Sequence, residues 1–193
     1  MVADTILLRE KYSRASKHYD DISLIQREAA DELFDKLQPL CAQQSLLDVG
    51  IGTGYLAKRI KLSYPSLSVY GLDLARGMLE KSKLKIPDAG FVQSDAKYLP
   101  FKDETFDLVI SNLAYQWVGD LSLALQEGKR VLKNKGRFYF TIFSSSTCKE
   151  LREVIFSPPE SHIKNRQLRS IGNLPDKPFL ERILYEIGFQ DIR

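Results

Sequence analysis

The chain has 193 residues, of which 44% are hydrophobic, and a formal net charge of +3. This length suits one domain, and the hydrophobic share is enough for a core. No apolar run approaches the roughly 20 residues that a membrane span needs, and basic residues begin at Arg9, so we expect no secretory signal. Because the net charge is also small, we expect a cytoplasmic protein that binds neither membranes nor nucleic acid.

The first predicted element is a helical segment from Tyr12 to Leu37. Its apolar positions are Ile22, Leu24, Ile25, Ala29, Leu33, Phe34 and Leu37. Because the segment precedes the first strand, we expect it to cover the sheet. The polar or amphipathic residues that it can present to a ligand are Tyr12, Arg14, Tyr19 and Gln26.

The next segment predicts a strand, a tight turn and a helix that ends near Ser63. Its sequence is Leu46-Leu-Asp-Val-Gly-Ile-Gly-Thr-Gly-Tyr55. Glycine tolerates positive φ and lets a ligand lie against the backbone, and the start of a helix suits a negatively charged group. The turn that binds a nicotinamide dinucleotide requires a third glycine at the position of Tyr55, so a nicotinamide cofactor is less favoured here. Asp48 has two open roles, since it either meets the ligand or holds the turn through backbone hydrogen bonds.

A second strand is predicted from Leu67 to Asp73, roughly 20 residues beyond the glycines, where a carboxylate accepts hydrogen bonds from the ribose hydroxyls of a nucleoside. Leu74 and Met78 follow near the start of a helix and can cover one face of an adenine. Met78 can equally belong to the core. A third strand, Gly90 to Asp95, again ends in a carboxylate.

A fourth strand runs from Thr105 to Asn112 and is continuous enough to be buried on both faces. A helix from about Leu121 to Leu132 leads to a fifth strand, Gly136 to Phe143. Strands that alternate with helices in this order predict an α/β fold, a doubly wound Rossmann-like parallel sheet whose ligands lie at the carboxyl ends of the strands.

Asp48 followed by Gly50-x-Gly52-x-Gly54 resembles motif I of the class I S-adenosylmethionine-dependent methyltransferases. The resemblance implies S-adenosyl-L-methionine as cofactor, with S-adenosyl-L-homocysteine as its product, and a single domain made of an N-terminal helical lid (1–44) and a Rossmann-like core (45–193). In the family pattern Asp95 binds the adenine amino group. The donor-binding residues that follow are Asp48, Gly50, Gly52, Asp73, Leu74, Met78, Asp95, Ala96, Asn112 and Gln26.

Three segments make the resemblance narrower: Tyr12 to Glu28, Ser111 to Leu121, and Cys148 to Arg152. Together they are similar to the malonyl-acyl carrier protein O-methyltransferases of biotin precursor synthesis. This implies methyl transfer to the free carboxylate of a malonyl group on acyl carrier protein, the expected partner. Trans-aconitate methyltransferases and an arginine-modifying assembly factor of complex I share the Ser-Asn-x-x-x-x-Trp strand end. The alternatives are therefore another small carboxylate such as trans-aconitate, or a donor-binding assembly or regulatory protein without turnover.

A carboxylate with a pKa of roughly 4 is already ionised at neutral pH, so this reaction needs no general base. The two histidines, His18 and His162, do not lie at predicted strand ends. We therefore expect no certain catalytic residue and name Tyr19, Tyr115 and Trp117 as positioning candidates, with Trp117 alternatively a packing anchor. The candidates to grip the acceptor carboxylate are Arg14, Arg27, Arg152 and Arg166.

Two features depart from the family pattern. Before the fifth strand, the family usually has Lys-Pro-Gly-Gly, whereas this chain has Lys133-Asn-Lys-Gly136. We expect Asn134 to supply the left-handed turn. After a helix from about Pro178 to Ile187, a sixth strand is expected to begin at Gly188, where the family continues into a seventh. If the chain is a shortened form, we expect donor binding with weak or absent acyl-carrier-protein methylation. Cys41 and Cys148 suggest neither a metal site nor a disulfide.

Overall fold

The computed structural model describes residues 2–37, 39–40, 44–147 and 174–193, and leaves out the side chains of residues 2–4. The chain divides into two units, Met1–Thr141 and Ile142–Arg193, and each is described by itself.

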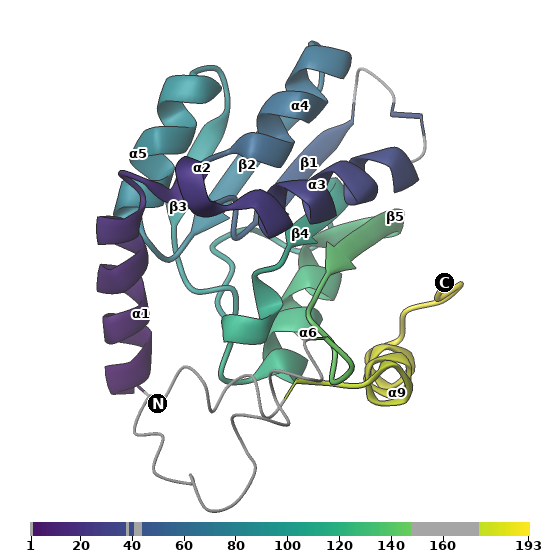
Figure 1. The fold of residues 1–193 in the computed structure, drawn as a ribbon. Coiled ribbons are helices and arrows are strands. Elements are labelled where there is room, and N and C mark those ends of the chain that lie inside the picture. The colour runs from purple at the N-terminus through teal and green to yellow at the C-terminus, as the bar shows by residue number, and fades with distance from the viewer. Residues whose placement is uncertain (1, 38, 41–43, 148–173) are drawn as a thin grey trace, which may run out of the picture. The chain divides into compact units, whose positions relative to one another are not determined.

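The first unit contains a parallel sheet of five strands in the order β3-β2-β1-β4-β5 (Figure 1). The strands are β1 (Ser45–Val49), β2 (Ser68–Asp73), β3 (Gly90–Gln93), β4 (Phe106–Asn112) and β5 (Leu132–Thr141). From β1 the chain builds outward to β3 and then returns to β4 on the other side of β1. The predicted doubly wound fold is confirmed, and its switch point, where such folds bind ligands, lies between β1 and β4.

Helices cover both faces of this sheet (Figure 1). They are α1 (Val2–Ala15), α2 (Tyr19–Ile22), α3 (Leu24–Lys36), α4 (Tyr55–Ser63), α5 (Arg76–Lys85), the 3-10 helix η1 (Tyr115–Trp117) and α6 (Leu121–Val131). Successive side chains of a strand point to opposite faces. In β5, Tyr139 packs on the core that includes α3 and α4, whereas a Cβ on Gly128 of α6 would lie 3.0 Å from the ring of Phe138.

The N-terminal segment forms three helices where the sequence predicted one. The chain leaves the α-helix after Ala15, where the hydroxyl of Ser16 donates to the carbonyl of Ser13 at 2.8 Å, and again at the buried Ser23. Ile22 is 73% exposed, whereas Ala30 and Leu33 are buried. Only the second half of the predicted apolar face therefore meets the sheet.

The turn into β5 also differs from the prediction. Lys135, with φ at +63°, takes the left-handed conformation that we expected of Asn134. Leu132 already pairs with Phe106, and regular pairing resumes at Leu108 with Arg137, so residues 133–136 form an irregularity inside the strand.

The second unit contains α9 (Lys177–Ile187). Asp176 caps its start by accepting a hydrogen bond from the N–H of Phe179 at 2.8 Å, and Gly188 ends it with φ at +93°. Residues 189–193 form no strand, so the expected sixth strand is not present in the described part of this unit.

Candidate functional site

The turn between β1 and α4 is shaped by three glycines in the left-handed region, with φ of +77° at Gly50, +57° at Gly52 and +81° at Gly54. A Cβ on Gly50 would stand 2.3 Å from the Cβ of Ala114, and one on Gly54 would stand 3.0 Å from the hydroxyl of Ser82. A Cβ on Gly52 would meet nothing within 4 Å. Gly50 and Gly54 are therefore needed for packing, whereas Gly52 borders open space.

Asp73, at the end of β2, ties this turn to the next helix. Its Oδ2 accepts from the N–H of Gly52 at 2.9 Å, and its Oδ1 accepts from the N–H of Ala75 at 2.8 Å. Burial raises the pKa of Asp73 to about 6. A carboxylate has roughly four lone-pair positions, so both oxygens keep acceptor capacity for two ligand hydroxyls.

Asp48 lies behind the turn and does not line the cavity. It is 2% exposed, and burial, reinforced by the charge of Asp73, raises its pKa to about 8. Within the described residues its carboxylate accepts no hydrogen bond from the turn. The backbone contacts that hold the turn come from Asp73 and from the carbonyl of Leu72, which accepts from Gly50 at 2.7 Å.

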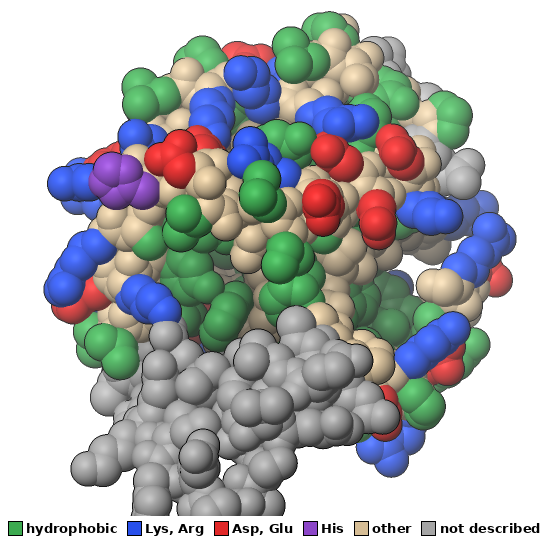
Figure 2. Space-filling model, in the orientation of Figure 1, with side chains coloured by type: hydrophobic (Ala, Val, Ile, Leu, Met, Phe, Trp, Pro, Cys, Tyr) green, Lys and Arg blue, Asp and Glu red, His purple; other side chains and the backbone are tan. Residues whose placement is uncertain are grey.

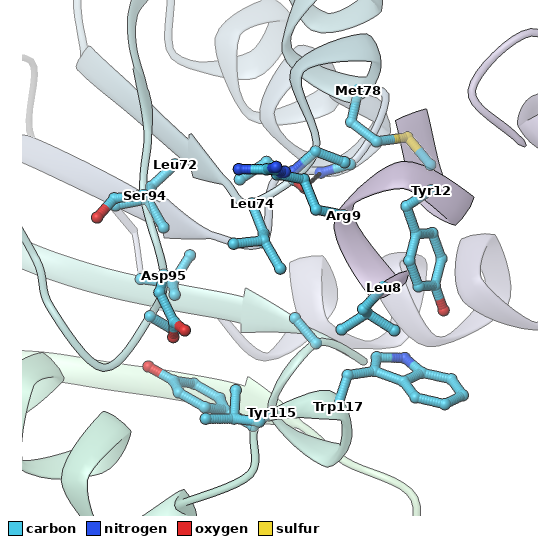
Figure 3. Close-up of a pocket in the computed structure, with 18 of the residues that line it drawn as sticks. Leu8, Arg9, Tyr12, Leu72, Leu74, Met78, Ser94, Asp95, Tyr115 and Trp117 are labelled. Carbon is cyan, nitrogen blue, oxygen red and sulfur yellow. Dashed lines mark hydrogen bonds between the residues drawn. The ribbon is translucent and has the colours of Figure 1, made fainter. Parts of the chain in front are cut away.

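A cavity opens above the carboxyl ends of the strands (Figure 3), and Figure 2 shows hydrophobic side chains in the hollow beside α1. It brings together most of the residues predicted from the sequence, namely Gly50, Gly52, Asp73, Leu74, Met78, Asp95, Ala96, Asn112, Tyr19, Tyr115 and Trp117. Asp48 and Gln26 are not among its lining residues. Met78 is 1% exposed and lines the cavity as well, so it serves the core and the site together.

Asn112 uses its side chain to join three elements. Its Nδ2 donates to the carbonyl of Gln26 at 2.8 Å, and its Oδ1 accepts from the hydroxyl of Thr141 at 2.7 Å. The next residue, Leu113, has φ at +48°, an uncommon conformation for a residue with a side chain. Gln26 therefore supports the site through its main chain, and Asn112 fixes the end of β4 against α3 and β5.

Aromatic rings from α1, α2 and η1 form one wall of the cavity. The ring of Tyr12 lies 6.2 Å from that of Tyr19 and 6.0 Å from that of Trp117, each in an edge-to-face arrangement. The sequence interpretation missed Thr5, Leu8 and Arg9, which line the same cavity from α1. Their spacing with Tyr12 is i, i+3, i+4 and i+7, the period of one helical face, and could have identified them.

A polar cluster joins α2 to the glycine turn and to α5. The carboxylate of Asp20 accepts from the hydroxyl of Thr53 at 2.6 Å and pairs with the ammonium of Lys85 at 2.7 Å. We call these three residues the Asp20 clasp. Burial raises the pKa of Asp20, but the hydrogen bonds from Lys85 and Thr53 outweigh it and keep the pKa below its usual range.

The predicted arginines do not gather at the cavity. Arg14 pairs with Glu10 at 3.2 Å on the surface, and the guanidinium of Arg27 lies 6.0 Å from the centre of the Tyr55 ring. Arg152 and Arg166 lie outside the described residues, as do Cys41, Cys148 and His162. Arg9 is exposed at the rim.

The described residues contain no group of three side chains suited to a metal ion. The helices in that part of the chain are also too short or too polar to cross a bilayer.

The arrangement suits a nucleoside with a charged tail. Leu74, Met78 and Ala96 offer apolar contact to a purine, and Asp73 offers acceptors for ribose hydroxyls. Asp95 also lines the cavity, where its Oδ1 accepts from the N–H of Lys97 at 3.0 Å. The backbone at Gly52 leaves room for a ligand to lie directly on the turn. The residues present therefore fit the nucleoside that the glycine pattern predicted.

Comparison with known proteins agrees with this geometry. Residues 47–140 match a methyltransferase domain family. A malonyl-[acyl-carrier protein] O-methyltransferase of Methylovorus sp. is 36% identical over 215 residues, which cover 100% of this chain and 72% of that protein. The protein of the same name from Halorhodospira halophila is 36% identical over 153 residues, or 77% of this chain and 52% of that one. The chain thus spans between about half and three quarters of these two relatives' lengths.

Solved structures share the fold. The phosphoethanolamine N-methyltransferase 2 of Haemonchus contortus, in complex with S-adenosyl-L-methionine, superimposes with a TM-score of 0.73 at 22% identity, over 94% of this chain and 42% of that one.

Proposed function

Because the chain belongs to the class I S-adenosylmethionine-dependent methyltransferases and has S-adenosyl-L-methionine as its cofactor, we propose that it methylates the free carboxylate of a malonyl group on acyl carrier protein. The observation that carries the proposal is the 36% identity, over the whole chain, to a relative named for that reaction. A role in biotin precursor synthesis follows as part of the same proposal.

The donor site is built from residues of three strand ends. Asp73 accepts from the ribose hydroxyls, Leu74 and Met78 cover the adenine, and Asp95 accepts from its amino group. When bound, S-adenosyl-L-methionine supplies a methyl group that is attached to a positively charged sulfur. The open space at Gly52 lets the methionine part of the donor lie against the backbone.

The cavity suits an acceptor that is already ionised. No histidine lines it in the described part of the chain, and its two aspartates, Asp73 and Asp95, are assigned to the donor. A malonyl carboxylate, with a pKa of roughly 4, needs no proton removed at neutral pH. The protein has to place the carboxylate oxygen behind the methyl carbon and keep water away, and positioning then supplies most of the acceleration.

Three aromatic side chains provide the wall that excludes water. Tyr12 of α1 contacts both Tyr19 of α2 and Trp117 of η1, and all three line the cavity. Because these three side chains line the cavity together, the acceptor meets the donor beside an apolar wall. Tyr19 and Trp117 are thus positioning residues in this proposal, with no proton to transfer.

The test is methyl transfer from a tritiated-methyl donor to malonyl-acyl carrier protein, with acetyl-acyl carrier protein as the matched control that lacks the free carboxylate. We expect a base-labile label on the malonyl form alone. Equal labelling of both carriers, or transfer to trans-aconitate but not to the malonyl carrier, would contradict the proposal. Calorimetric titration with S-adenosyl-L-homocysteine, run in parallel, shows whether the donor site is formed.

A further inference from the structure

A second groove lies next to the donor cavity, and Arg9 lines both. Figure 3 shows the Arg9 side chain pointing from α1 toward the side of the cavity on which Leu74 lies. The groove is formed by α1, the start of α5 and the end of β3, and we call it the arginine groove. Its lining residues are Arg9, Glu10, Ser13, Arg14, Arg76 and Gln93. A ligand that leaves the cavity at Arg9 therefore enters this groove.

The arginine groove concentrates positive charge. Three arginines and one glutamate line it, which leaves two positive charges in excess. Glu10 pairs with Arg14 at 3.2 Å, whereas Arg9 forms no ion pair within the described part of the chain. Figure 2 shows basic side chains along α1 beside the hydrophobic hollow. Because like charges that are held together repel one another, the groove should attract an anion.

Arg76 stands at an unfavourable place for a cation. It is the first residue of α5, whose first turn contains no acidic residue. The N–H groups at the start of a helix carry a partial positive charge, so an acidic side chain is the one that stabilises this position. Glu80 pairs with Arg76 at 3.0 Å and offsets only part of the repulsion. Guanidinium groups beside the start of a helix are a combination that suits a phosphate group.

The guanidinium groups keep donors for a ligand. Each has five N–H donors, of which Arg14 uses one at Nη2 for Glu10 and Arg76 uses the one at Nε for Glu80. The other donors of both side chains form no hydrogen bond within the described residues. Several charge-assisted hydrogen bonds to one phosphate are therefore available in the groove.

The anion in the groove cannot be the carboxylate that is methylated. That carboxylate has to lie beside the donor, whereas none of the residues assigned to the donor lines the groove. The ligand must carry a second anionic group further along its chain. An acyl group on a carrier protein meets this requirement, because its thioester ends a flexible arm that is joined to the carrier through a phosphodiester.

We propose that the arginine groove binds the phosphodiester of the arm that carries the acyl group, while the acyl end of the arm lies in the donor cavity. The inference rests on the proposed function for the identity of the acceptor. In it, Arg14 and Arg76 bind the arm, and Arg9 stands where the arm passes from the groove into the cavity.

The first experiment compares two small acceptors that differ only in the phosphate. They are malonyl-pantetheine and the same compound with a methyl phosphodiester at its alcohol end, and the chain is saturated with S-adenosyl-L-homocysteine so that no methyl is transferred. We expect calorimetry to show about tenfold tighter binding of the phosphodiester, the worth of two or three exposed ion pairs, and a smaller ratio at high salt. Inorganic phosphate should bind more weakly than the phosphodiester. Equal affinities of these two would make the groove a site for free phosphate and would overturn the assignment to the arm.

The second experiment removes two of the three charges. In a variant that combines Arg14→Gln with Arg76→Gln, the ratio of the two affinities should fall close to one. The ratio is the readout because a general disturbance of the fold would lower both affinities together. Arg9 is kept, since it also lines the donor cavity.

Arg182→Gln, on α9, is the matched control. The side chains of Arg76 and Arg182 are 78% and 68% exposed, and each pairs with a glutamate four residues further along its helix. Because Arg182 does not line the groove, its replacement should leave the ratio unchanged.

Three results would overturn the inference: equal affinity of the unchanged chain for the two small acceptors, a ratio that survives in the double variant, or no binding of either compound. A failure of the proposed function is read separately, as absent methyl transfer to malonyl-acyl carrier protein. Transfer to the carrier without a preference for the phosphodiester would contradict the groove and leave the reaction standing. A preference for the phosphodiester without transfer would support the groove and contradict the reaction.

Discussion

The two walls of the cavity are held in different ways. The turn wall, residues 49–54 with Asp73, is fixed by backbone hydrogen bonds and by close packing at Gly50 and Gly54. The lid wall, made by α1 and α2, is held by ring edges and by the Asp20 clasp. At Gly50 and Gly54 the turn wall therefore cannot be altered without altering the fold. The lid wall depends on a few side chains and can be loosened separately.

The largest effects are expected at the glycines of the turn wall. In Gly52→Ala the new methyl group has room in the free protein, so stability should fall by only about 1–2 kcal/mol for the left-handed backbone. The methyl group then occupies space that the donor needs, and the affinity for S-adenosyl-L-methionine should fall at least tenfold, as measured by calorimetry.

Gly50→Ala is the companion variant. Its Cβ would stand 2.3 Å from the Cβ of Ala114, so the fold itself should be lost, which circular dichroism and thermal melting detect. A Gly52→Ala protein that binds the donor as tightly as the unchanged chain would remove the turn wall from the site.

The second prediction concerns pH and again belongs to the turn wall. Burial raises the pKa of Asp73 to about 6, and we expect its ionised form to bind the ribose. Donor affinity should therefore be constant above pH 7 and fall about tenfold for each pH unit well below 6. The same raised pKa makes the free protein lose stability as pH rises through 6, so ligand binding and ligand-free stability should move in opposite directions. Calorimetry and thermal melting between pH 5 and 8 measure both, and a pH-independent affinity over that range would argue against an ionised Asp73.

The third prediction tests the lid wall. Asp20→Asn removes the charge that pairs with Lys85 at 2.7 Å and weakens the bond from Thr53. The lid should open more often, and the dissociation rate of S-adenosyl-L-homocysteine should rise about three- to tenfold, with a smaller ratio at high salt. Stopped-flow fluorescence of Trp117 can measure the rate.

Asp21→Asn is the matched control for the clasp. Asp21 is adjacent, its side chain is 77% exposed, and its ion pair is a 3.8 Å contact with His18. It should leave the dissociation rate unchanged. If Asp20→Asn lowers the melting temperature without changing that rate, the clasp supports the fold but does not control the lid.

The same contrast explains what the sequence could predict. Gly50, Gly52, Gly54 and Asp73 were assigned correctly to one turn and one neighbouring strand end, because the required backbone geometry leaves few residue choices. The lid could not be derived in that way. Its breaks at Ser16 and Ser23 are single polar residues inside a helical pattern, and the clasp joins Asp20 to Thr53 and Lys85 across long stretches of chain.

The sequence also could not predict whether certain residues line the cavity, because they fit either of two environments. The sequence pattern assigned Asp48 and Gln26 to the site, but they do not line the cavity. Arg9 lies outside the predicted helix and does line it. Which side of a strand or helix faces a cavity depends on the packing of the other elements. The arginine groove is likewise visible only once α1, α5 and the end of β3 are placed together.

The smallest expected effect concerns Asp48, behind the turn wall. Its folded-state pKa is raised to about 8, mainly by burial, so its contribution to stability is complete below pH 4 and is lost as pH rises through 8. Asp48→Asn keeps the shape of the side chain and removes the ionisation. The melting temperature of the unchanged chain should therefore fall by a few degrees more than that of the variant between pH 6 and 9, with Asp21→Asn as the control for a lost surface carboxylate. Parallel curves for the two proteins would mean that Asp48 does not titrate between pH 6 and 9 in the folded protein, which would contradict the prediction.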